Sequence, residues 1–293
     1  MPYVGPAART GAASSLITTW RYLRRRPLIF ASAAAIAVML LLALFAERVA
    51  PHDPVKTSFV DLLRPPGAPY LLGTDQFGRD LLSRLIYGSR TALLVGFSSA
   101  FVGCTAGALI GVVSAYFGGR TDLVIQRLMD VILSFPLIIL ALGVVAVLGA
   151  GTLNVIIAIT IPTIPRMARV VRSSALAIRQ MPYVEAARAV GAEHARIIFY
   201  HLVPNVMAPY LIMLTAFLGQ AILLEASLSF LGLGVAEPTP AWGLMLRGGS
   251  LQFAERAPWL AIFPGLAISA AVFAFNLLGD SLRDALDPRL RIG

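Results

Sequence analysis

Five stretches of the chain run for at least 20 residues without Asp, Glu, Lys or Arg: 27–46, 91–119, 131–165, 197–224 and 257–279. An apolar α-helix of roughly 20 residues crosses the ~30 Å hydrocarbon core of a bilayer. Each stretch is therefore long enough to span a membrane. Charged residues make up 13% of the chain and hydrophobic residues 58%, so there is too little charge to cover a soluble surface. The pattern predicts an all-α integral membrane protein.

The longest uncharged run, 131–165, would be roughly 52 Å long as a single helix, too long for one span. It contains the segment 149–154, Gly-Ala-Gly-Thr-Leu-Asn, whose composition is typical of a loop. Two helices joined by a tight turn are therefore expected. The sequence then predicts six spans, at 28–46, 91–116, 124–148, 153–171, 206–230 and 259–279.

The first predicted span could be a cleaved signal peptide or a retained anchor. Its apolar stretch is longer than the core of an ordinary signal peptide. Glu-Arg-Val-Ala-Pro at 47–51 is a poor small-residue cleavage site. A retained anchor is expected. The single cysteine, Cys104, lies in the second predicted span and permits no intrachain disulfide.

The distribution of basic residues predicts the orientation. Six spans place both termini on one side of the membrane, and with the termini inside, 16 of the 24 Lys and Arg residues face inward. Cytoplasmic loops carry an excess of Lys and Arg, so N-in and C-in is expected. The net charge of +9 then reflects topology, and binding to nucleic acid is not expected.

Small residues and prolines mark two of the predicted spans. Gly96, Gly103, Gly107 and Gly111 lie on one face of the second span and allow another helix to approach closely, either within this subunit or at a subunit interface. Pro162 and Pro165 remove backbone donors from the fourth span. They predict a kink or break, as structural kinks or beside a transport path.

Few ionisable groups suggest chemistry inside the membrane. Glu225 lies within the fifth predicted span, in an otherwise uncharged membrane segment, and such residues often serve function. It either contributes to a substrate path or gate, or reaches the outer interface. His52, His194 and His201 have no spacing typical of a metal site.

The polar segment 179–204 separates the fourth and fifth predicted spans. Met181-Pro182 favours a helix start, Gly191 a helix end, and a second short helix is expected over 192–201 before Pro204 begins the fifth span. The segment reads as a helix–turn–helix knob at the membrane face. Taken alone, it could also be a basic amphipathic connector on lipid.

The knob also carries a family resemblance. Glu185-Ala186-Ala187, then Gly191, then Pro204 thirteen residues later, resembles the EAA loop of ABC importer permeases. The family consensus has Ile and Leu where this chain has His201 and Val203, and the His-x-x-Pro-Asn form resembles the peptide/nickel branch. Further blocks of that branch are matched at 73–80 with 83–84, 225–234, 242–243 and 283–289. The resemblance covers about residues 20–293 and is closest to the C-type permease of dipeptide or oligopeptide importers.

The resemblance implies a type I ABC importer permease fold with six transmembrane helices in a bacterial inner (cytoplasmic) membrane. It divides the chain into a cytoplasmic N-terminal segment (1–26), a first transmembrane helix (27–46), an extracytoplasmic loop (47–90), a permease domain (91–280) with its coupling loop (179–204), and a cytoplasmic tail (281–293). It implies an ATPase-coupling site made of Glu185, Ala186, Ala187, Gly191 and Pro204. The expected partners are a second homologous permease, two cytoplasmic ABC ATPases, an extracytoplasmic substrate-binding protein and membrane lipids.

The chain is not expected to bind ATP itself. A Walker A loop needs Gly-Lys, and the one lysine, Lys56, follows Val55. ATP and Mg²⁺ are expected on the partner ATPases, with no cofactor and no catalytic residue in this chain.

The outer segments allow two interpretations. The loop 47–90 and the loop near 237–242 either fold over the helix ends or dock the binding protein, with Asp75, Arg79, Asp80 and Trp242 as docking candidates. The rival functions are the same machinery carrying nickel, glutathione or another small solute, a stand-alone secondary transporter or channel, and a non-transporting scaffold.

Overall fold

The computed structural model describes residues 27–286; the predicted N-terminal segment 1–26 and residues 287–293 of the tail lie outside this range. Within it the chain is helical and contains no strand, only an isolated bridge between Thr74 and Asp80. The α-helices are α2 (Pro27–Leu44), α3 (Ala46–Val49), α4 (Leu81–Phe117), α5 (Gly119–Leu133), α6 (Leu137–Leu148), α7 (Thr152–Arg179), α8 (Pro182–Ala189), α9 (His194–Ile197), α10 (Met207–Phe230), α11 (Trp242–Gln252) and α12 (Trp259–Leu286).

Four continuous helical segments are long and apolar enough to cross a membrane. They are α4, α7, the run His194–Phe230 that ends in α10, and α12. Helices α5 and α6 pass the same test only together, and Phe30–Leu44 of α2 is a shorter apolar helix. The described residues thus contain four candidate spans, or five if the α5–α6 pair is one span.

The third predicted span, 124–148, is wrong as a single straight helix. Helix α5 ends at Leu133, and α6 starts after Pro136 at an angle of 86°. A residue that precedes proline is disfavoured in helical geometry, so Phe135 stops the first helix. The expected turn after it is confirmed, because Gly149 and Gly151, both with positive φ, separate α6 from α7.

Of the kink or break expected at Pro162 and Pro165, the break is wrong, since α7 continues through both prolines to Arg179. The physical reason is the packing of α4 on this stretch. A Cβ at Gly103 would lie 2.9 Å from the Thr163 Cβ atom, and one at Gly107 would lie 2.4 Å from the Ile164 carbonyl oxygen. Such close contact fixes the helix over the positions where proline removes a hydrogen bond.

The other two glycines of the predicted stripe also lie at helix contacts inside the subunit. A Cβ at Gly111 would lie 2.5 Å from the Ala168 carbonyl oxygen of α7, and one at Gly96 would lie 2.7 Å from Ile222 of α10. The glycine face of α4 therefore packs on its own chain along most of its length.

Three helices are longer than the predicted spans. Helix α4 begins ten residues before the predicted start at 91, with Asp80 as its cap, and α7 and α12 run past 171 and 279. Each of these extensions contains charged residues, which a rule based on uncharged length excludes. Helices α2 and α10 lie close to their predicted bounds.

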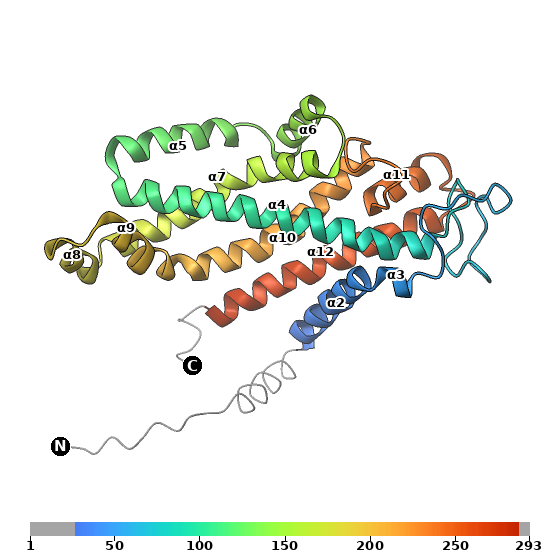
Figure 1. Ribbon diagram of the computed structural model, residues 1–293, viewed down its shortest axis with the longest axis horizontal. Helices are drawn as coiled ribbons and strands as arrows, with labels where there is room; N and C mark the ends of the chain where they lie inside the picture. Colours follow the sequence, from blue (N-terminus) through green and yellow to red (C-terminus); the bar gives the residue numbers. More distant parts are fainter. Residues whose placement is uncertain (1–26, 287–293) are drawn as a thin grey trace, which may run out of the picture.

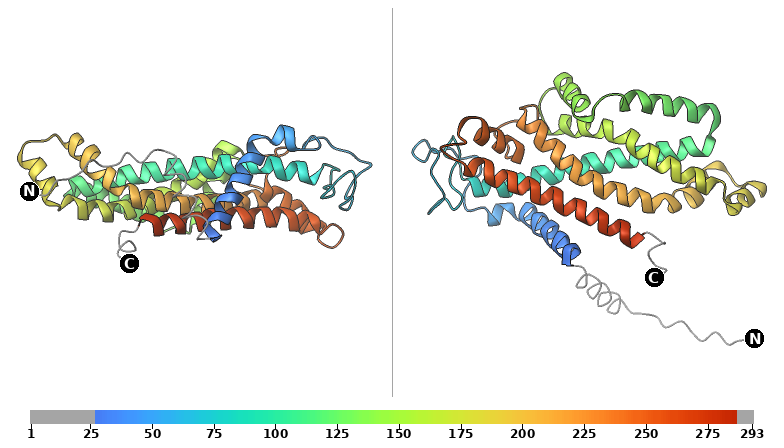
Figure 2. Two further views of the ribbon diagram at one scale, coloured as in Figure 1. Left: turned by 90° about the horizontal axis from the view of Figure 1, so that it is seen from below. Right: turned by 180° about the vertical axis from the view of Figure 1, so that it is seen from behind.

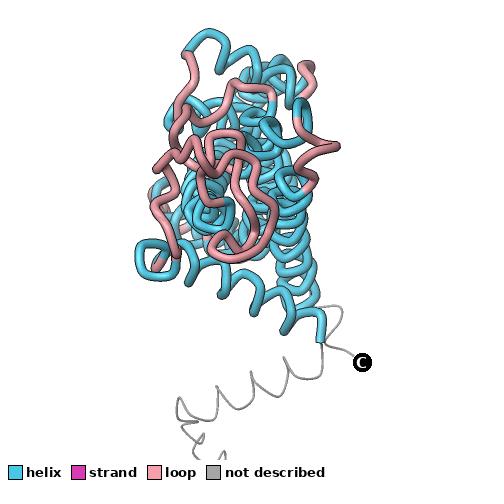
Figure 3. Tube along the Cα trace, turned by 90° about the vertical axis from the view of Figure 1, so that its right-hand side faces the viewer, coloured by secondary structure: helices cyan, strands magenta, loops and turns pink. Residues whose placement is uncertain are grey.

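The bundle has two distinct ends (Figure 1). Helices α8 and α9 lie at one end, together with the C-terminal end of α4, whereas the loop between α3 and α4 lies at the other end with α11. Figure 2 shows α2 lying beside α12 at the edge of the bundle. Seen along the bundle, the α3–α4 loop covers the helix ends (Figure 3).

Candidate functional site

The knob formed by α8 and α9 is anchored by a few apolar side chains. Val184, Ile197 and Leu202 are fully buried, whereas Glu185 and Ala186 are exposed and Ala187 is half-buried. Pro182 occupies the first turn of α8, a position where its missing N–H is not needed. The knob therefore presents the predicted Glu-Ala-Ala stretch outward on a fixed base.

Gly191 ends α8 in a left-handed conformation, with φ of +79° and no atom within 4 Å of a Cβ placed there. The N–H of Gly191 donates to Arg188 O at 3.0 Å, and the N–H of Ala192 donates to Ala187 O at 3.0 Å. This is the closure with which glycine commonly ends a helix. The position leaves an open surface beside Ala187. Pro204 is exposed in a short 3-10 turn that leads into α10.

The knob is also tied to the end of α4. The Tyr116 hydroxyl and His194 Nδ1 lie 2.6 Å apart, and the Arg188 guanidinium lies 5.2 Å from the centre of the Tyr116 ring. Arg179, at the end of α7, donates to the Ala115 carbonyl at 3.0 Å. Sequence reasoning missed this contact because Tyr116 and His194 are 78 residues apart and no local pattern links them.

Large apolar side chains are exposed around the same knob. Val190 is 84% exposed and Tyr200 is 75% exposed, and Tyr183 and Phe199 are also exposed. Exposed apolar groups beside a charged residue are typical of a protein contact surface.

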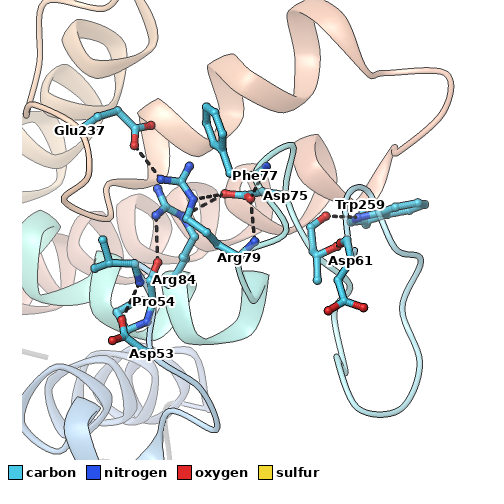
Figure 4. A network of polar contacts seen from close by, with 11 residues as sticks. Asp53, Pro54, Asp61, Asp75, Phe77, Arg79, Arg84, Glu237 and Trp259 are labelled. Carbon is cyan, nitrogen blue, oxygen red and sulfur yellow. Dashed lines mark hydrogen bonds and ion pairs between the residues drawn. The ribbon is translucent and has the colours of Figure 1, made fainter. Parts of the chain in front are cut away.

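At the opposite end of the molecule, a buried network of charged side chains joins several segments (Figure 4). Asp75 accepts from Arg79 Nε at 2.6 Å and from the Phe77 N–H at 2.9 Å, and Arg84 Nε lies 3.5 Å away. Arg79 Nη1 reaches Glu237 at 2.8 Å, and Arg84 Nη1 donates to the Pro54 carbonyl at 3.0 Å. The network thus joins the α3–α4 loop, the start of α4 and the loop before α11.

The charge state of Arg79 follows from this network. Burial acts to lower the pKa of its guanidinium, but the hydrogen bond that Arg79 donates to Glu237 and the charge of Asp75 outweigh it and raise the pKa above its ordinary value. Arg79 therefore stays fully charged, and its two carboxylate partners balance that charge.

Asp80 and Trp242 have structural contacts of their own. Asp80 caps α4 by accepting from the Ser83 N–H at 2.9 Å and the Ser83 hydroxyl at 2.6 Å, and Trp242 donates its indole N–H to Leu85 O at 2.9 Å. A Cβ at Gly88 would lie 2.6 Å from the Trp242 ring, so glycine is needed for the ring to fit.

The four residues predicted to dock a binding protein therefore make their contacts within this chain and stabilise its fold. Asp75, Arg79, Asp80 and Trp242 are each at most 5% exposed, and side chains this buried do not reach a partner's surface. Beside them lies a cavity of about 540 Å³, lined by Thr57, Gln76, Phe77, Arg79, Glu237, Leu244, Arg247 and Gly248. The accessible groups at this end are neighbours of the predicted ones, such as Phe77 and Glu237.

The predicted path residues are not brought together. Glu225 is 1% exposed and its carboxylate accepts from the Ser229 hydroxyl at 2.7 Å, whereas Pro162 and Pro165 are buried in α7. A cavity of about 690 Å³ lies elsewhere, among α5, α7, α10 and α12, and none of the three lines it. Within residues 27–286 no group of three or more His, Cys, Asp or Glu side chains could hold a metal ion.

Comparison with known proteins decides the family. The family model described as the binding-protein-dependent transport system inner membrane component matches residues 107–292, more than half of the chain. The chain belongs to this family. A second model, the N-terminal transmembrane domain of oligopeptide transport permease C, matches residues 14–66.

Individual relatives cover nearly the whole chain. A putative peptide transport system permease protein of Brucella suis is 42% identical over 95% of this chain and 94% of its own length. The dipeptide transport system permease protein DppC of Alkalihalophilus pseudofirmus is 39% identical over 94% of this chain and 91% of its own length. The glutathione transport system permease protein GsiD of Pectobacterium atrosepticum is 42% identical over 94% of this chain and 93% of its own length.

A solved structure shares the fold. A chain of the MetNI methionine ABC transporter in an inward-facing conformation superimposes with a TM-score of 0.57 over 70% of this chain and 96% of that chain, at 19% identity. The described helices thus have the arrangement of an ABC transporter permease.

Proposed function

We propose that the chain is a permease subunit of an ATP-driven, binding-protein-dependent importer of dipeptides or oligopeptides, and forms half of the translocation path. The observation that carries this proposal is the knob: α8 projects Glu185, Ala186 and the open surface at Gly191 from buried anchors, at one end of a bundle with the permease fold. The family match and the peptide-transport relatives support the same function.

The partners follow from this role. Two cytoplasmic ABC ATPases bind ATP and Mg²⁺, and one of them receives α8 in a surface groove against Glu185, Ala186, Ala187 and Gly191. A second homologous permease completes the path, and an extracytoplasmic binding protein docks on the outer end around Phe77 and Glu237. The subunit itself is not an enzyme.

The topology belongs to the same proposal. Helix α2, helix α4, the bent α5–α6 pair, α7, α10 and α12 make six passes with both termini in the cytoplasm of a bacterial cell. The knob, the start of α2 and the end of α12 all face the same end of the bundle (Figure 1), in agreement with the positive-inside bias. A cysteine at Val190 should resist an impermeant thiol reagent in intact spheroplasts, and one at Phe59 should react. The reverse labelling would refute this topology.

The decisive experiment uses the assembled importer in proteoliposomes. Glu185→Lys or Gly191→Asp should leave the subunit in the membrane and uncouple ATP hydrolysis from peptide uptake. The matched control is Glu193→Lys, which reverses another exposed acid of the knob outside the Glu-Ala-Ala stretch. Normal coupled uptake in both test variants would refute the coupling site.

A second substrate is favoured by a specific observation. The glutathione permease of Pectobacterium atrosepticum is as similar to this chain as the Brucella peptide permease is, and glutathione is itself a tripeptide. Mass spectrometry of the ligand that copurifies with the cognate binding protein distinguishes the two. A ligand other than a peptide, such as a nickel complex, would overturn the peptide assignment.

A further inference from the structure

Arg166 lies in the middle of a membrane-spanning helix. It is near the centre of α7, which runs from Thr152 to Arg179, so roughly 20 Å of helix separates it from either end. The span predicted from the sequence, 153–171, contains Arg166 near its inner end. In the structure α7 continues to Arg179, so Arg166 lies farther from the end of the helix than the predicted span placed it.

The other arginines of this part of α7 have acidic partners. Arg172 forms an ion pair with Asp122 at 2.5 Å, and Arg169 forms one with Asp130. Both acids belong to α5. Among residues 27–286, Arg166 has no Asp or Glu oxygen within 4 Å, and its guanidinium donates a long hydrogen bond of 3.4 Å to the Gln220 side-chain oxygen. No acidic side chain in the described part of the chain neutralises this cation.

Arg166 faces the cavity of about 690 Å³ enclosed by α5, α7, α10 and α12. Three other polar side chains line it, Arg169 of α7, Gln220 of α10 and Asn276 of α12, and the remaining lining residues are apolar. Arg169 is already paired with Asp130. Gly219 allows Asn276 to approach α10, since a Cβ there would lie 2.9 Å from Asn276 Oδ1. The volume is within the roughly 300–1,000 Å³ of small-molecule sites.

An unpaired charge in the middle of a membrane is costly, and such residues face water-filled paths or partners. We propose that Arg166, Gln220 and Asn276 form an anion-recognition point that takes the carboxylate of the peptide passing through the permease. A guanidinium binds a carboxylate through two parallel N–H donors. The amide NH₂ groups of Gln220 and Asn276 add donors at the same site. This inference rests on the proposed function and gives the substrate feature that the path recognises.

The first test measures whether the cavity attracts anions, and it does not require transport. Ala216, an exposed residue that lines the same cavity one turn before Gln220, is changed to cysteine in the complete complex of two permeases and two ATPases in nanodiscs. Its reaction rates with an anionic methanethiosulfonate (sulfonatoethyl) and a cationic one (trimethylammonium-ethyl) are compared. The native Cys104 is buried, so the parent complex gives the background rate.

In the Ala216→Cys complex the anionic reagent should react faster than the cationic one. Arg166→Gln should lower the ratio of the anionic to the cationic rate by roughly tenfold, because one unit charge in a partly screened cavity attracts one probe and repels the other. Arg166→Lys should keep the preference. Arg127→Gln, which removes an exposed arginine that does not line the cavity, should not change it. An unchanged ratio in Arg166→Gln, or no anionic preference before mutation, would show that a partner subunit already neutralises Arg166 and would overturn the site.

The ligand is tested by protection. Millimolar dialanine should slow modification of the Ala216→Cys complex, and dialanine amide, which lacks the carboxylate, should not. Equal protection by both, or by neither, overturns the carboxylate assignment. Uptake of dialanine is measured in parallel with the binding protein present. Absence of uptake of this dipeptide and of longer alanine peptides refutes the proposed function together with the site, whereas uptake without anionic preference refutes the site alone.

Discussion

The two ends of the bundle are built on different physical principles. The end that carries the α3–α4 loop, which we propose is the outer end, is fixed by Asp75, Arg79 and Arg84, charged side chains that are buried and paired with one another and with Glu237. The knob at the other end is fixed by three apolar anchors and leaves its charges exposed. A buried ion network tolerates little displacement, because any movement leaves a charge unpaired. Apolar anchors with an exposed polar face suit a part that a second protein must hold and move.

The largest effect is expected in the outer network. Asp75→Asn removes the carboxylate that two buried arginines share, and breaking such a buried pair costs about 3–5 kcal/mol. We expect a large loss of thermal stability in detergent, or no folded protein. The matched control is Glu237→Gln, whose half-exposed carboxylate should contribute at most about 1 kcal/mol. Equal losses in the two variants would mean that burial does not set the difference.

An intermediate loss of stability is expected at the contact between α4 and α7, which run along the bundle between its two ends. Gly107→Ala places a Cβ 2.4 Å from the Ile164 carbonyl oxygen, and the backbone shift it forces should cost about 1–3 kcal/mol. Gly143→Ala on α6 meets no atom within 4 Å and should be neutral or slightly stabilising. Thermal unfolding of the two variants measures this contrast, and a neutral Gly107→Ala would show that α4 and α7 are free to move apart.

The smallest effect on stability, with a large effect on coupling, is expected at the knob. Tyr116→Phe removes the hydroxyl that contacts His194 and should cost about 1 kcal/mol of stability. It should also lower peptide uptake per ATP hydrolysed. Tyr210→Phe is the control, because it removes a hydroxyl contact to Thr105 of α4 at 2.9 Å away from the knob. If both variants lowered the uptake ratio equally, Tyr116 would have no specific part in coupling.

Much of the fold could be predicted because the length of an uncharged run and the positions of glycines that end helices can be read from the local sequence. The turn at Gly149–Gly151 and the helical nature of the chain follow from them. The bend at Pro136 and the continuity of α7 could not be predicted by counting charges, since the first depends on one proline inside an apolar run and the second on packing by α4. The Glu-Ala-Ala stretch was visible as a motif, and the structure places it on an exposed surface.

The outer site was harder to predict for a physical reason. The Gly-Thr-Asp-Gln-Phe-Gly-Arg-Asp block is recognisable, but sequence cannot show whether its charges face a partner or each other. Burial of Asp75 and Arg79 answers that question. The predicted span 153–171 included Arg166, but the sequence could not show that α7 continues to Arg179 or that Arg166 lines a cavity with side chains of α10 and α12, because both depend on tertiary packing.

The sharp bend between α5 and α6 shows that an apolar segment need not be long enough to cross the membrane. Hydropathy measures how well the segment partitions into lipid, but not how far it extends across it. Helix α6 has 12 residues and is roughly 18 Å long, little more than half of a ~30 Å hydrocarbon layer. With α5 turned nearly at right angles to it, neither arm can cross alone. Only together do the two arms pass as one span, so a substitution that changed the bend would change how far this part of the chain reaches across the membrane.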